Sequence, residues 1–163
     1  MTDYDLKLQQ LQKEFIEINT KRANKWQFTP DQKAIYDFVI KSQRYTTFNI
    51  AGYDIILKVG NEDFGFKHFL LKHYGTGCVG EIKANDILKL GNVIKHNISV
   101  PAKEDKIKFI QTKGDLKYSV VLKPQKDGKL VVSFFSSKEE IKIIEQIEII
   151  NKISISVEIE TKL

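Results

Sequence analysis

Two of the three histidines in this chain lie close together with two lysines in a short amphipathic run. The run is GFKHFLLKHY at residues 65–74, and it contains Lys67, His68, Lys72 and His73. Histidine has an ordinary pKa of about 6.5 and exchanges protons near neutral pH, while lysine supplies cations that contact phosphate. This combination of residue types indicates acid–base chemistry on a phosphodiester.

The spacing of these histidines argues against a metal site. Zinc-binding HExxH helices carry two histidines on one face, four residues apart, whereas His68 and His73 are five apart with no glutamate between them. Cys78 is the single cysteine, and the glycines around it lack the Gly-Lys-Ser/Thr sequence of a phosphate loop. The Gly-x-Ser-x-Gly sequence of serine hydrolases is absent too. We therefore expect neither a metal ion nor a cofactor.

The helical periodicity of the run separates the two histidines. On a wheel of about 100° per residue that starts at Phe66, His73 lies within about 80° of the apolar stripe and His68 at about 200°. We expect His68 to project outward and transfer protons, unless it is an ordinary exposed histidine. His73 is expected to point inward, either as a second proton-transfer group or as a histidine of the core.

Positive charge is concentrated in the middle of the chain. Residues 65–137 carry thirteen lysines against six acidic residues, whereas residues 1–64 are balanced and residues 138–163 carry a small acidic excess. An excess confined to one segment is expected of a surface that binds a polyanion. The alternative is a lysine-rich face that only contacts water.

Helical periodicity comes first in the chain, and strand-like alternation follows. Thr29 and Pro30 are typical of a helix N-cap and first turn, and turn residues at 113–115 and 124–128 separate three apolar runs. The predicted helices span 4–23, 30–42, 65–74, 84–96 and 138–151, and the predicted strands lie within 45–58 and at 106–112, 116–123, 129–135 and 153–159. These patterns predict an α+β fold: N-terminal helices packed on a small antiparallel sheet, with a C-terminal helix and strand.

The composition changes near Tyr45, where strand-forming residues replace helix-forming ones. We therefore predict an N-terminal helical extension, 1–44, and an α+β domain, 45–163. The N-terminus lacks the features of a signal peptide, no run approaches the roughly 20 apolar residues of a membrane span, and one cysteine needs no oxidising compartment. We expect a cytoplasmic protein that does not enter a membrane, although delivery into a target cell by another route stays open.

Four segments carry a resemblance to a known family. These are residues 65–73, 85–94, 118–123 and 130–135. Within residues 45–137 the chain resembles the phage and mobile-element branch of the barnase/EndoU/colicin/RelE-like (BECR) nuclease superfamily. The resemblance implies a helical layer on an antiparallel sheet and a metal-independent endoribonuclease, often a toxin. Its partners would be RNA and an antitoxin or immunity protein.

The resemblance also assigns roles to individual residues. His68 would act as general acid or base, His73 as the second proton-transfer group, and Lys67 as a phosphate contact. The other carried-over candidates are Tyr118 and Ser133 for catalysis, and Lys72, Lys117 and Lys123 for RNA binding.

One departure from the family concerns arginine. The only arginines, Arg22 and Arg44, lie outside the basic segment, so lysines would have to contact the phosphate. The alternative function is a catalytically inactive module of the same fold that binds RNA or another protein. The basic segment argues against an antitoxin or immunity protein, which would present an acidic surface.

Overall fold

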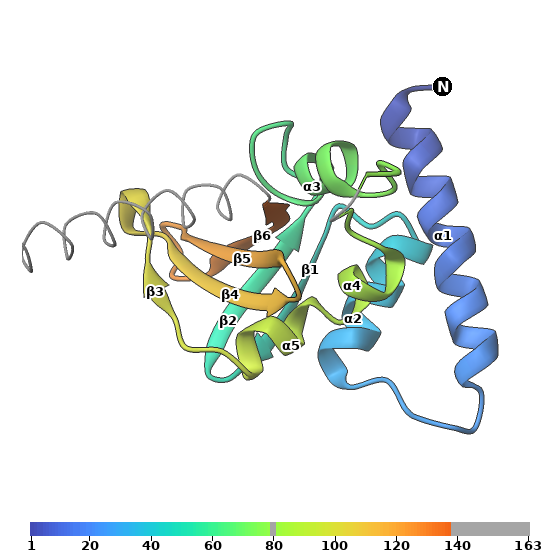
Figure 1. Cartoon of the computed structure of the whole chain (residues 1–163), viewed down its shortest axis with the longest axis horizontal. Coiled ribbons are helices and arrows are strands. Elements are labelled where there is room, and N and C mark those ends of the chain that lie inside the picture. The colour runs from blue at the N-terminus through green and yellow to red at the C-terminus, as the bar shows by residue number, and fades with distance from the viewer. Residues whose placement is uncertain (79–80, 138–163) are drawn as a thin grey trace, which may run out of the picture.

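The computed structural model describes residues 1–78 and 81–137, which form helices packed on a six-stranded sheet (Figure 1). The helices are α1 (Asp3–Arg22), α2 (Pro30–Ile40), α3 (Phe66–His73), α4 (Ala84–Leu88), α5 (Leu90–Lys95) and the short 3₁₀ helix η1 (Lys103–Asp105). The strands are β1 (Tyr45–Ile50), β2 (Tyr53–Lys58), β3 (Val100–Pro101), β4 (Ile107–Lys113), β5 (Leu116–Pro124) and β6 (Leu130–Ser137). The predicted α+β class is confirmed.

Local sequence signals set the beginnings of the first two helices. The side chain of Thr2 caps α1, and the side chain of Thr29 caps α2, where Pro30 follows. In both helices a polar side chain at the third position accepts a hydrogen bond from the backbone N–H of the cap residue. Such capping boxes satisfy backbone N–H groups that have no partner inside the helix. The predicted start of the second helix at Thr29–Pro30 is therefore confirmed.

The sheet is mixed, with strand order β1-β2-β6-β5-β4-β3. The hairpin β1–β2 and the meander β4–β5–β6 are antiparallel, as predicted, but β2 pairs with β6 in parallel at Ile55–Leu130 and Ile56–Val131. The prediction of a purely antiparallel sheet was wrong because the helices and the meander between β2 and β6 return the chain to the edge of β2 in the same direction. The sheet is nevertheless mostly antiparallel.

The middle of the chain differs from the helix predicted there. The single helix predicted at 84–96 is two short helices, α4 and α5, because the backbone at Lys89 leaves the helical region (φ −104°, ψ 19°). The helix predicted at 138–151 and the strand predicted at 153–159 lie outside the described residues.

The first 44 residues share one hydrophobic core with the sheet. Leu11 and Phe15 of α1 belong to the same buried cluster as Phe66 and Phe69 of α3 and Phe134 of β6. Burial of this apolar surface is the main force that holds α1 and α3 against the sheet.

Polar contacts then fix the C-terminal turn of α3 to α1. The Nζ of Lys7 donates to the carbonyl oxygens of Leu71 (3.0 Å) and Tyr74 (2.8 Å), and the Tyr74 hydroxyl donates to Glu14 Oε1 (2.6 Å). The last carbonyls of a helix have no partner within it, so the lysine satisfies groups that would otherwise need water. The N-terminal helix thus positions the histidine-bearing helix.

The buried carboxylate of Asp31 lies between α2 and α5 and packs directly against Gly91. Asp31 is 3% exposed, and its Oδ1 accepts from the Thr29 hydroxyl (2.6 Å) and from Lys95 Nζ (3.3 Å). A Cβ atom added at Gly91 would overlap Asp31 Oδ2 and would lie 2.6 Å from Ile50 Cδ1. Only glycine allows this approach.

The variant Gly91→Ala is therefore expected to be less stable than the parent. Overpacking should lower the free energy of unfolding by about 1–3 kcal/mol, against the gain of about 1 kcal/mol that alanine brings to an open helix position. Urea denaturation followed by circular dichroism measures the difference. A variant that is more stable than the parent would contradict the close approach of Asp31 to Gly91.

Candidate functional site

The loop between β2 and α3 has a fixed conformation. Asn61 Oδ1 accepts from the backbone N–H groups of Asp63 (2.8 Å) and Phe64 (3.1 Å), and the Lys67 N–H donates to the Val59 carbonyl (2.8 Å). Gly65 precedes α3 with φ 102°, a conformation that favours glycine. The loop and the first turn of α3 are thereby held against the end of β2.

His68 is oriented by this loop. Its Nδ1 lies 2.6 Å from the backbone carbonyl oxygen of Glu62. Because a carbonyl only accepts, Nδ1 carries the proton, and in the neutral ring the lone pair is on Nε2. His68 can therefore take up a proton at Nε2 without losing the bond that orients it.

His68 lines a cavity of about 460 Å³ together with Ser133. A second cavity of about 200 Å³ shares one residue with it, Phe64. We call the two cavities the Phe64 groove. Its other lining residues are Asp63, Pro101, Ala102, Lys103, Lys106, Lys108 and Val121 in the first cavity, and Lys58, Gly60, Asn61, Lys123, Pro124, Gln125 and Val131 in the second.

The register of the sheet explains how these residues meet. Ser133 of β6 is opposite Val121 of β5, which is opposite Lys108 of β4, so all three side chains project from one face. Val120 and Phe134 project from the other face and belong to the hydrophobic core. The groove therefore lies on the sheet face opposite the core.

Helix α3 contributes to both faces because it lies beside β6. The β2–β6 pairing ends at Ile56–Val131, and α3 contacts β6. Phe69 packs toward the core, with its ring centroid 6.3 Å from that of Phe134, while His68 lines the groove with Ser133. One helix thus supplies a core anchor and a groove histidine.

Ser133 has unused hydrogen-bonding capacity. It is 2% exposed, and its Oγ has no hydrogen-bond partner in the described structure. A buried hydroxyl without a partner is costly, and most such groups in proteins are satisfied. The Oγ of Ser133 therefore has unused hydrogen-bonding capacity beside the groove, and a ligand could bond to it once the atom is uncovered.

His73 lies next to His68, contrary to the predicted separation. The two ring centroids are 5.5 Å apart. The wheel assumed a regular helix, but the last turn of α3 is widened, since the Tyr74 N–H bonds to the carbonyl of Phe69 five residues earlier. His73 is nevertheless not among the residues that line the groove cavities.

The pKa of His73 is lowered to about 4. Burial is the main cause, followed by the charges of His68, Lys72 and Lys7. His73 is therefore uncharged at neutral pH. It lies beside His68 but is not in the imidazolium form that a general acid requires at that pH.

The titration of His73 makes the stability of the fold depend on pH. Between its ordinary pKa of 6.5 and its folded pKa of about 4, the unfolded chain binds a proton at His73 that the folded chain does not. The free energy of unfolding is therefore expected to fall as the pH drops through this window. In His73→Gln this part of the decline should disappear. Urea denaturation of both proteins between about pH 7 and about pH 4 measures it, and parallel declines would contradict the lowered pKa.

The remaining predicted residues are divided between the groove and other places. Lys123 lines the groove, as do His68 and Ser133. Lys67 is directed toward α1, with its Nζ 5.9 Å from the Tyr4 ring centroid. Lys72 on α3 is exposed, and neither it nor Lys117 on β5 lines the groove.

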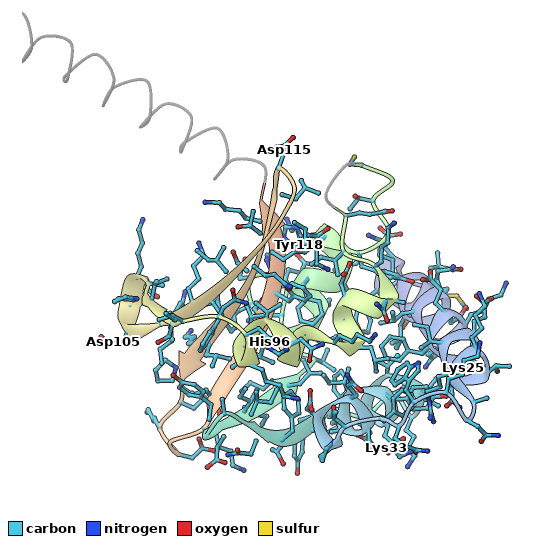
Figure 2. The ribbon with its side chains drawn as sticks, turned by 60° about the horizontal axis from the view of Figure 1, so that its bottom comes forward. Lys25, Lys33, His96, Asp105, Asp115 and Tyr118 are labelled. Atoms are coloured by element: carbon cyan, nitrogen blue, oxygen red, sulfur yellow. The ribbon has the colours of Figure 1, made fainter. Side chains whose placement is uncertain are left out.

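Tyr118 lies on the core face of the sheet. It is 8% exposed and lines a separate pocket of about 90 Å³ with Asp86 and Lys113, and burial is the main cause that raises its pKa. Figure 2 shows Tyr118 well separated from Asp105, the last residue of η1, whose first residue Lys103 lines the groove. The structure therefore does not bring Tyr118 together with His68.

Several groove residues were missed at the level of sequence. Phe64 and Lys58 flank the loop before α3, Lys103 lies in η1, Lys108 in β4, and Lys106 between these two elements. Lys106 and Lys108 alternate with apolar residues, a period-two pattern that indicates a basic face on a strand. That signal was available, whereas the participation of Phe64 depended on tertiary structure.

Within residues 1–78 and 81–137, no three His, Cys, Asp or Glu side chains are grouped as they would be around a metal ion. Among the described helices, none combines the length and the apolar character that crossing a bilayer requires.

Comparisons with protein-family models, curated proteins and solved structures gave no match. Its distinguishing features are the α+β fold and the Phe64 groove, which is lined by one oriented histidine and several lysines.

Proposed function

We propose that the protein is a metal-independent endoribonuclease and that the Phe64 groove is its active site. The observation that carries the proposal is His68, whose Nδ1 is held by the Glu62 carbonyl while its ring lines a cavity with three lysines. A histidine fixed in one tautomer within a cationic cavity is suited to acid–base catalysis on a phosphodiester. The resemblance to BECR nucleases supports the same conclusion.

The groove residues can be assigned to the steps of RNA cleavage. His68 Nε2 takes the proton of the 2′-hydroxyl, whose oxygen attacks the adjacent phosphorus. The bond from phosphorus to the 5′-oxygen breaks, which leaves a 2′,3′-cyclic phosphate. Lysine ammonium groups stabilise the crowded phosphorane, and one of them protonates the leaving 5′-oxygen; Ser133 Oγ donates to a phosphate oxygen. His73 is uncharged at neutral pH and lies beside His68.

A catalytically inactive RNA-binding module is the second candidate. It is favoured by the composition of the groove: among the described residues that line it, His68 is the one histidine, and the cations are all lysines. Without a strong general acid, binding could occur with little turnover. If the enzyme is a toxin, its antitoxin or immunity partner should present an acidic surface to the groove.

Incubation of the purified protein with mixed cellular RNA in EDTA tests the proposal. We expect fragments that end in 2′,3′-cyclic phosphate, and no cleavage of the same sequences carrying 2′-O-methyl groups. Loss of cleavage in EDTA would contradict the metal-independent mechanism. Binding without cleavage would support the second candidate instead.

A further inference from the structure

Phe64 is the one described residue that lines both cavities of the groove, of about 460 Å³ and about 200 Å³. It is half-buried and does not belong to the hydrophobic core cluster or to the apolar side chains packed against it. A large aromatic ring outside the core gains little from packing at this position. Its location between two cavities that are both lined by lysines therefore indicates another role.

The loop that carries Phe64 is preformed. The Phe64 N–H donates to Asn61 Oδ1 and its carbonyl accepts from the Asn61 N–H, each at 3.1 Å. Gly60 packs so closely against the Phe64 carbonyl that an added Cβ would overlap it. A ring presented by a rigid loop binds without an ordering cost.

Lysines surround the ring. Lys106 Nζ lies 5.5 Å and Lys123 Nζ 5.9 Å from the centroid of Phe64, and these lysines line different cavities. A base stacked on the ring would therefore have phosphates on both sides within reach of ammonium groups. Aromatic platforms with flanking cations are the usual way in which proteins bind single strands, whose bases are free to stack.

We infer that the groove binds single-stranded RNA with one base stacked on Phe64 and with neighbouring nucleotides in the two cavities. This inference rests on the proposed function, because it takes RNA as the ligand. It goes further because it defines the substrate as single-stranded RNA and predicts that more than one nucleotide is bound in the groove. Bases within a duplex are covered by their neighbours and cannot reach the ring.

Binding of a non-cleavable RNA tests the inference separately from catalysis. The probe is a 2′-fluoro dodecamer with one 2-aminopurine, which lacks the attacking hydroxyl; it is used as a single strand and annealed to its complement. Fluorescence anisotropy gives the affinity, and quenching of 2-aminopurine reports stacking. The variants are Phe64→Leu, Phe64→Trp, and Tyr45→Leu as a control at an exposed aromatic residue of β1.

We expect the full-length protein to bind the single strand more tightly than the duplex. Phe64→Leu should weaken single-strand binding by about 5- to 150-fold, because one base–aromatic stack is lost. The quenching of 2-aminopurine should decrease for the same reason. Phe64→Trp and Tyr45→Leu should bind like the parent. If circular dichroism shows that Phe64→Leu does not fold, two other measurements test the inference. These are the affinity of the parent for the single strand compared with the duplex, and the affinity of Phe64→Trp for the single strand.

The outcomes separate this inference from the proposed function. Equal binding of single strand and duplex, or unchanged binding by a folded Phe64→Leu variant, would overturn the stacking role and leave RNA binding in place. If neither probe binds, both the proposed function and this inference are overturned.

Discussion

His68→Ala is expected to reduce RNA cleavage by about 10²- to 10⁴-fold, the usual contribution of a general base. The structure gives the reason, since His68 alone among the described groove residues carries an imidazole, and its Nδ1 is already bonded to the Glu62 carbonyl. Affinity for non-cleavable RNA should change little, because the lysines of the groove remain. Single-turnover cleavage together with anisotropy separates the two effects.

Two controls sharpen this experiment. His68→Asn keeps an N–H that can donate to the Glu62 carbonyl but cannot take up a proton, so it should be as inactive as the alanine variant. His96 is exposed at the end of α5 (Figure 2) and is not among the lining residues of the groove, so His96→Ala should cleave like the parent. Full activity in His68→Asn would contradict the base assignment, and full activity in His68→Ala would exclude this site.

Replacement of Lys103, Lys106 and Lys123 by glutamine is expected to weaken RNA binding strongly and to reduce its salt dependence. Each phosphate contact to a single strand contributes about 0.7 to the slope of log K against log salt, so three should contribute about 2. At about 0.1 M salt this corresponds to an affinity loss of about 100-fold. Titrations at several salt concentrations measure the slope directly.

A control of equal charge is available at the other end of the molecule. Figure 2 shows Lys25 and Lys33 on the side of α1 and α2, well separated from Asp105. Replacing Lys21, Lys25 and Lys33 by glutamine removes the same net charge from outside the groove. An equal effect of both triple substitutions would mean that RNA responds to net charge and does not occupy the groove.

The sequence predicted those parts of the fold that depend on local signals. Thr29 and Pro30 fixed the start of α2, and the hairpin β1–β2 turns at Ala51–Gly52, where both residues have positive φ (52° and 87°). The parallel pairing of β2 with β6 was not predictable, because it joins Ile56 to Val131 far along the chain and leaves no periodic pattern. Long-range pairing is determined by the packing of the whole sheet.

The candidate site was predicted in part for similar reasons. His68 and Ser133 were identified from the sequence and share a cavity in the structure. Tyr118 was misplaced, although it alternates with Lys117 and Ser119, so the period of two in β5 already puts its side chain on the core face with Val120. The adjacency of His68 and His73 required the widened last turn of α3, which a regular wheel does not represent.

The contacts between α1 and the C-terminal turn of α3 have a consequence for inhibition. Lys7 and Glu14 hold Leu71 and Tyr74 from α1, and none of these four residues lines the groove. A small molecule or peptide that pulled Lys7 away would loosen the turn behind His68 without competing with substrate. In the proposed nuclease, such an inhibitor is expected to lower the maximal rate and leave the Michaelis constant nearly unchanged.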